Sequence, residues 1–221
     1  MKGQSMTDAL LLKKYIEAFY IFDDRKVIVG RPKRGILAKM SFYLLSVFNT
    51  VENVPKDMWE TDTVDNGTIS WNVIECKSSE NDLAVLEDKL NAKLPYLYRL
   101  LIMNYRFWKA NLDTHRLLAN PTGLGFNGLL QQIFADKSIY PNLLKNGFIQ
   151  FAWLGELYDP VCFNLNEKIE DDCQIVSIDH ETLMSEGKIE KKVLAQSYRN
   201  LVSDTIIAVE KFKKQENKNS V

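Results

Sequence analysis

Three short apolar runs in the last third of the chain constrain its fold more than any other feature. They span residues 148–154, 161–165 and 174–179, and turn-forming residues separate each run from the next. Short runs rich in β-branched and aromatic residues, divided by such turns, are typical of neighbouring antiparallel strands. The sequence therefore predicts an antiparallel meander in this region.

A stripe of leucines predicts a helix before this meander. The stripe recurs at helical spacing and consists of Leu83, Leu86, Leu90 and Leu94. A polar cluster at 78–82 can cap the start of the helix, and Pro95 stops it. We expect the stripe to be buried together with apolar side chains of the meander, namely Phe151, Val161, Phe163 and Val176.

Other parts of the chain show weaker patterns. Tyr98, Leu101, Ile102 and Tyr105 indicate a second helix directly after Pro95. Apolar residues from 194 to 212 predict a closing amphipathic helix, and the polar residues 215–221 predict a disordered tail. The stretch 117–144 is rich in Gly and Asn and predicts no clear element.

The N-terminal third carries its own mixture of elements. Helical spacing covers 7–22 and 36–47, and short β-branched runs predict strands at 26–30 and 68–74. The acidic stretch 51–67 is broken by Pro and Gly and predicts a loop.

The composition favours one domain over residues 1–221, because 46% of them are hydrophobic and supply a sizeable core. The 28 basic and 29 acidic residues nearly cancel, so total charge does not mark a nucleic-acid or membrane-surface binder. The chain shows neither a signal-peptide core nor the ~20 apolar residues of a membrane-spanning helix. Cys76, Cys162 and Cys173 form no paired framework, which suits a reducing compartment. We therefore expect a cytoplasmic protein that binds no membrane.

Four segments together resemble the SUKH superfamily. The first is Leu86-Glu87 followed by Lys93-Leu94-Pro95 and the residues to Leu101, and the others are 148–152, 158–165 and 174–181. The resemblance lies in their succession, since each motif alone is short and mostly apolar. It implies an α+β fold in which a mainly antiparallel sheet packs against helices. The SUKH-like core then spans 78–209, and residues 1–77 form an N-terminal α/β elaboration. Tyr105 departs from the pattern, because many relatives carry glycine after the position of Asn104.

The resemblance also implies a function in protein binding. The superfamily joins bacterial immunity proteins that neutralise polymorphic toxins, the SecY-interacting protein Syd, and fungal regulators of cell-wall synthesis. We therefore interpret the chain as an intracellular immunity protein that binds a cognate toxin, with no catalytic chemistry of its own. A regulatory or scaffolding protein that binds an endogenous partner is the alternative, since fold alone does not decide function.

An excess of negative charge predicts the partner-binding surface. Residues 156–186 hold nine acidic residues and one basic residue, Lys168, for a net charge of −8 in a chain whose total is −1. Eight of these carboxylates form the predicted site: Glu156, Asp159, Glu167, Glu170, Asp171, Asp172, Asp179 and Glu181. Many fall at turns between strands, where they could present one negative surface to a basic partner such as a nuclease toxin. The competing interpretation is a set of solvated turns.

Two motifs keep an enzymatic interpretation open. Residues 123–128 fit the spacing G-x-G-x-x-G, but Pro121 stands where a buried parallel strand should end. Asp179, His180 and Glu181 are consecutive, but neighbours on a strand point to opposite faces and hold one metal poorly. We therefore expect no cofactor, no metal and no catalytic residue, with a nucleotide-dependent enzyme as a lesser alternative.

Two further features could belong to a surface or to the core. A basic run could contact phosphates, and it consists of Arg25, Lys26, Arg31, Lys33, Arg34 and Lys39. Solvated turns explain such a run more simply, so we do not expect nucleic-acid binding. Trp153 could be an exposed interface anchor or a core residue that closes the sheet, and we favour the core.

Overall fold

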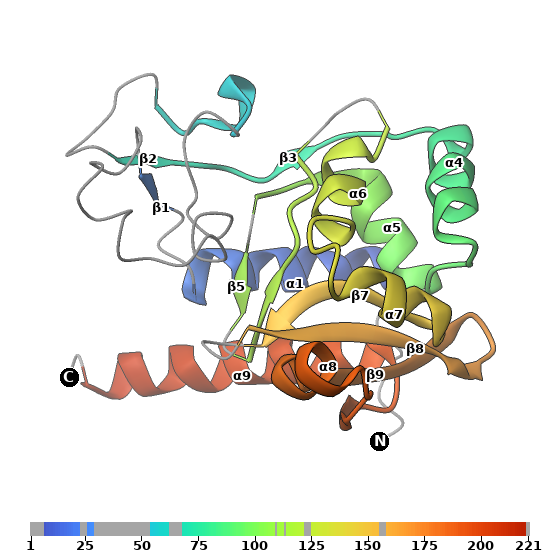
Figure 1. Cartoon of the computed structure of the whole chain (residues 1–221). Coiled ribbons are helices and arrows are strands. Elements are labelled where there is room, and N and C mark those ends of the chain that lie inside the picture. Colours follow the sequence, from blue (N-terminus) through green and yellow to red (C-terminus); the bar gives the residue numbers. More distant parts are fainter. Residues whose placement is uncertain are drawn as a thin grey trace, which may run out of the picture.

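An antiparallel sheet of six strands dominates the structure, a computed structural model, with strand order β10-β9-β8-β7-β6-β5 (Figure 1). Its long central strands are β7 (Phe148–Leu154), β8 (Asp159–Ile169) and β9 (Asp172–Ile178). The shorter ones are β10 (Lys191–Ala195), β6 (His115–Leu117) and β5 (Asn111–Leu112). The predicted meander is therefore confirmed. The structure describes residues 7–22, 26–28, 54–61, 68–108, 110–112, 114–121, 125–154 and 158–219.

Helices pack against both faces of this sheet. The larger core contains side chains from α1 (Asp8–Phe22), α4 (Glu80–Leu90), α5 (Tyr96–Asn104), α6 (Asn127–Ile133) and α9 (Tyr198–Asn219). A smaller core on the opposite face involves α7 (Tyr140–Lys145) and α8 (His180–Glu186) (Figure 1). Successive residues of β8 separate the two, because Phe163 enters the larger core and Cys162 the smaller. The α+β class with a mainly antiparallel sheet is confirmed.

The larger core is built around stacked and edge-on aromatic rings. Phe151 and Phe163 stack with ring centroids 4.2 Å apart, and Tyr98 and Tyr198 meet Phe163 edge-on. The leucine stripe is buried in this core, as predicted, but α4 ends at Leu90 and not at Pro95, so Leu94 lies in the connection after the helix. Val176 is also buried, but it belongs to the smaller core on the other face, so it does not contact the stripe as we expected.

The first and last helices run parallel and side by side (Figure 1). Their polar flanks are joined by three ion pairs: Asp8–Arg199, Lys14–Glu210 and Glu17–Lys213. Their apolar flanks bury Tyr15 and Tyr198 edge-on, with centroids 6.5 Å apart. This packing makes α1 an integral part of the larger core.

Two small ladders involve the N-terminal region, and the second of them joins it to the rest of the chain. One joins β1 (Lys26–Ile28) to β2 (Thr68–Ser70), and the other joins β3 (Ile74–Glu75) to β4 (Tyr105–Arg106). The predicted strand 68–74 is thus interrupted, and a 3-10 helix, Lys56–Met58, precedes it. The buried Arg106 binds the Asp57 carboxylate with two nitrogens, at 2.5 and 3.2 Å. The helix predicted at 36–47 lies outside the described residues.

The structure corrects several boundaries. Tyr105 belongs to β4 and ends α5, and Leu194 belongs to β10 and not to the closing helix. Helix α9 continues to Asn219, where we predicted a disordered tail from Gln215. Within the described residues, no helix is long and apolar enough to span a membrane.

Candidate functional site

The predicted acidic residues are divided between the two ends of the β8–β9 hairpin. Glu167, Glu170, Asp171 and Asp172 lie at its turn, where Ile169 pairs with Asp172. The other described members lie at the opposite end, where the hairpin opens: Asp159, Asp179 and Glu181. About ten residues of extended chain separate the ends, which is roughly 30 Å. The residues therefore do not form the single negative surface that we expected, and Glu156 lies outside the described residues.

Carboxylates at the turn end are mostly free. Glu167, Glu170 and Asp171 are exposed, and none of them forms an ion pair with another described residue. Asp172 differs, because its carboxylate accepts hydrogen bonds from the backbone N–H groups of Tyr198 (2.8 Å) and Arg199 (3.2 Å). It caps the start of α9 and is not available to a partner.

Carboxylates at the open end are mostly engaged. Asp159 accepts hydrogen bonds from the backbone N–H of His180 (3.1 Å) and pairs with its Nδ1 (2.8 Å). Asp179 caps α8 by accepting from the Thr182 N–H at 2.7 Å, and this bond lowers the pKa of Asp179. Lys191 and Lys192 lie opposite Ile178 and Ser177 on the neighbouring strand, so they offset the remaining charge.

The turn also exposes apolar side chains. Ile169 is 56% exposed, more than any other large apolar residue in the described part of the chain. Tyr96 is 41% exposed and is joined to the turn by a hydrogen bond from its backbone N–H to the Asp171 carbonyl, 2.8 Å. Two apolar groups thus lie beside three free carboxylates.

A cavity of about 330 Å³ lies on the inner side of this turn. Lys93, Arg99 and Lys168 line it, together with Glu170 and Asp171. The Nε of Arg99 is buried without a hydrogen-bond partner within the described structure, and its guanidinium lies 5.8 Å from the Tyr96 ring centroid. Cations and carboxylates of the turn region therefore both line this cavity.

The Leu-Glu and Leu-Pro motifs of the family resemblance position one wall of this cavity. Glu87 is buried, and its carboxylate accepts hydrogen bonds from the Leu94 N–H (2.9 Å) and Lys93 Nζ (2.6 Å). These bonds fix the short connection between α4 and α5. The Leu86-Glu87 pair thus has a structural role, since Leu86 fills the core while Glu87 holds the connection.

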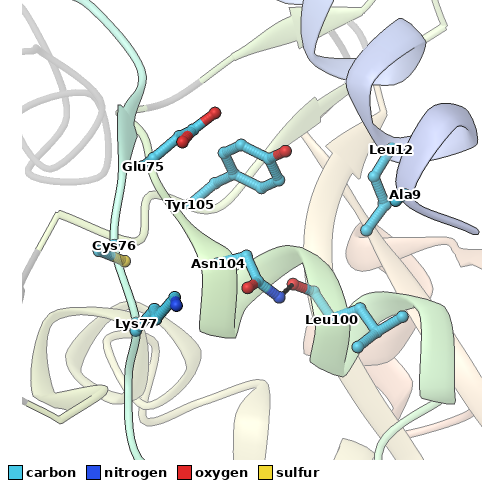
Figure 2. Close-up of a pocket in the computed structure, with 8 residues that line it drawn as sticks. All are labelled: Ala9, Leu12, Glu75, Cys76, Lys77, Leu100, Asn104 and Tyr105. Atoms are coloured by element: carbon cyan, nitrogen blue, oxygen red, sulfur yellow. Dashed lines mark hydrogen bonds between the residues drawn. The ribbon is translucent and has the colours of Figure 1, made fainter.

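A second cavity of about 540 Å³ lies between α1, β3 and α5 (Figure 2). Figure 2 shows Glu75 and Lys77 on one side of it and Ala9 and Leu12 on the other. No sequence pattern predicts this cavity, because its α1 wall lies more than sixty residues before its other walls.

The buried cysteines and the buried histidine lie in surroundings that disfavour their charged forms. Burial raises the pKa of the Cys162 thiol, and burial with the nearby Asp172 charge raises that of Cys173 to about 12. Burial lowers the pKa of His115 to about 4. Among the described residues, no three His, Cys, Asp or Glu side chains gather as a metal site would require.

The remaining candidates have these positions. The glycine-rich loop is described only from Gly125 onward, and it leads into α6. Every strand pair in the described residues is antiparallel, whereas a dinucleotide-binding sheet is mostly parallel. Trp153 is half-buried and packs against the larger core. The basic run lies outside the described residues, apart from the backbone of Lys26.

Sequence reasoning missed Ile169, Tyr96 and the cations of the inner cavity. A usable signal existed for Ile169, because it is the one large apolar residue between Asn166 and Asp172. Tyr96 and Arg99 had no such signal, since α5 reaches the turn only through the tertiary fold.

Comparison with known proteins adds no identification. No protein-family model matches the chain, and no curated protein matches it.

Proposed function

We propose that this chain is a protein-binding module of the immunity type, which captures a basic toxin domain in the cytoplasm through the turn end of the β8–β9 hairpin. One observation carries the proposal: the exposed Ile169 lies among the free carboxylates of Glu167, Glu170 and Asp171. The resemblance to the SUKH superfamily supports the immunity role.

The chemistry of this turn suits a protein partner. An interface gains most of its affinity from a few apolar anchors, while surrounding charges set the association rate and orientation. Ile169 and Tyr96 can serve as anchors, and the carboxylates can attract Lys and Arg side chains. A nuclease must expose such cations to bind phosphate, so a protein seated on them would block its substrate.

The inner cavity adds specificity to the same surface. A partner that meets carboxylates at the tip of the turn meets Lys93, Arg99 and Lys168 just inside it. Glu170 and Asp171 line the same cavity, so the surface there carries both signs of charge. Mixed charges of this kind reject partners that are merely basic.

The test begins with purification of the tagged chain from its native host and identification of the protein bound to it. Association rates are then measured at low and high salt for the double variant Glu170→Lys, Asp171→Lys. We expect association to slow roughly tenfold at low salt and to lose most of its salt dependence. Asp172 is left unchanged because it caps α9.

A charge-matched control separates the two ends of the hairpin. Glu181→Lys with Glu190→Lys changes the net charge equally but at the open end, and both side chains are exposed. This variant should associate nearly as fast as the parent. Equal slowing in both variants would show that only total charge matters, and fast binding by the turn variant would exclude the turn. Rescue of host growth from the co-expressed partner tests the immunity role itself.

A further inference from the structure

The larger cavity between α1, β3 and α5 has two chemically different walls (Figure 2). Ala9 and Leu12 of α1, with Leu100 of α5, form an apolar side. Glu75, Lys77 and Tyr105 supply a carboxylate, an ammonium group and a phenol. Its volume of about 540 Å³ falls in the range of small-molecule sites.

Local backbone geometry explains why the two charges share this cavity. The segment after β3 stays extended, because Cys76 N–H donates to the Asn104 carbonyl (2.8 Å) and Ser78 N–H donates to that of Met103 (2.9 Å). Side chains two residues apart on an extended segment leave it on the same side, roughly 7 Å apart. Tyr105 lies directly opposite Glu75 in the ladder.

Neither charge is neutralised within the described structure. Glu75 and Lys77 form no ion pair with each other or with another described residue. Glu186 and Lys188 have the same spacing in sequence, but the chain turns at Gly187 and they pair at 2.5 Å. The contrast shows that the extended backbone keeps Glu75 and Lys77 apart.

Two further groups can complete a polar site. The Asn104 side-chain nitrogen donates to the Leu100 carbonyl at 2.8 Å, which leaves its side-chain oxygen as an acceptor. Burial and the Glu75 charge raise the pKa of Tyr105, so its hydroxyl is a donor at neutral pH.

We propose that this cavity binds a small zwitterion with an apolar side chain, either a free amino acid or a short peptide. The ligand's ammonium group pairs with Glu75, and its carboxylate pairs with Lys77 and accepts from the Tyr105 hydroxyl. Its side chain packs on Ala9, Leu12 and Leu100. The site is separate from the hairpin turn and does not depend on the proposed partner.

Titration of the isotope-labelled protein with leucine, followed by NMR, tests the proposal. We expect saturable shifts of the amides of Cys76, Lys77 and Asn104, with a dissociation constant on the order of 1 mM. N-acetyl-leucine and leucine amide each lack one charge and should bind roughly two- to fivefold more weakly. Glycine lacks the apolar side chain, and its affinity should be up to roughly tenfold weaker than that of leucine. A parallel titration with leucyl-leucine tests whether the site prefers a short peptide to a free amino acid.

Variants connect the binding to the named charges. Glu75→Gln and Lys77→Gln should each weaken leucine or leucyl-leucine binding roughly two- to fivefold, with an unchanged melting temperature because both side chains are exposed. The matched control Glu186→Gln with Lys188→Gln should leave binding unchanged. The proposal fails if neither ligand gives saturable shifts at this site, or if both single variants bind as the parent does.

Discussion

The two ends of the β8–β9 hairpin carry similar numbers of carboxylates but use them differently. At the open end, Asp159 and Asp179 are bound to His180 and Thr182, and lysines follow on the neighbouring strand. At the turn end, only Asp172 is engaged, and the other carboxylates face solvent beside Ile169. A count of charges along a sequence therefore overstates the charge available to a partner, because some carboxylates are already engaged in helix caps and ion pairs.

The largest effect should come from acid at the open end of the sheet. His115 of β6 is buried near this end, where its neighbour in β7 is Leu154, and burial lowers its pKa to about 4. The unfolded chain binds this proton near pH 6.5 and the folded chain only near 4, so the free energy of unfolding falls as pH is lowered through that window. The loss should be about 3 kcal/mol.

Chemical denaturation at pH 7 and pH 4.5 measures most of this loss. His115→Gln should lower stability at pH 7 but remove most of the pH dependence in that window. Asp57 and Asp179, whose pKa values are lowered by hydrogen bonds to Arg106 and Thr182, lose their contribution only at still lower pH. An equally steep pH dependence in the variant would assign the effect to other groups.

A smaller effect should distinguish two adjacent carboxylates at the turn. Asp172→Ala removes the acceptor for two backbone N–H groups of α9 and should cost about 1–2 kcal/mol. Asp171→Ala removes an exposed side chain and should change stability by less than about 0.5 kcal/mol. Asp172→Asn keeps an acceptor and should recover most of the loss. Urea denaturation of the three variants decides whether Asp172 is the structural member of the pair.

The smallest effect should be a gain in stability at the tip of the turn. Glu170 has a φ of 53°, in the left-handed region that favours glycine. Glu170→Gly should raise the free energy of unfolding by up to about 1 kcal/mol while it weakens partner binding. Asn91, with a φ of 50°, provides the control, since Asn tolerates this conformation and Asn91→Gly should gain less. A clear loss of stability in Glu170→Gly would mean that the glutamate side chain supports the turn.

The sequence predicted those elements whose signals are local. Alternating apolar runs marked β7, β8 and β9, and a leucine stripe with a polar start marked α4, where Ser79 and Asp82 form reciprocal capping bonds. The elements between residues 105 and 145 are short, and they pair with or pack against strands from other parts of the chain. Such elements carry little pattern of their own.

The candidate site was predictable only in part. Glu167, Glu170 and Asp171 were found from charge alone, but the engagement of Asp172 depends on α9, which begins 26 residues later. The pairing of Asp159 with His180 spans 21 residues. The cavity between α1, β3 and α5 likewise joins α1 to residues far along the chain. Contacts between residues so far apart in sequence follow from the tertiary fold and produce no periodic pattern in the sequence.

The parallel packing of α1 against α9 has a consequence for synthesis of the chain on the ribosome. Helix α1 emerges long before α9, yet the residues that pair with Asp8 and meet Tyr15 edge-on are Arg199 and Tyr198. About 190 further residues must be synthesised before α1 can contact α9. We therefore expect the native core to close only after the C-terminal helix leaves the exit tunnel, so that translation arrested before α9 leaves an apolar face of α1 open to chaperones.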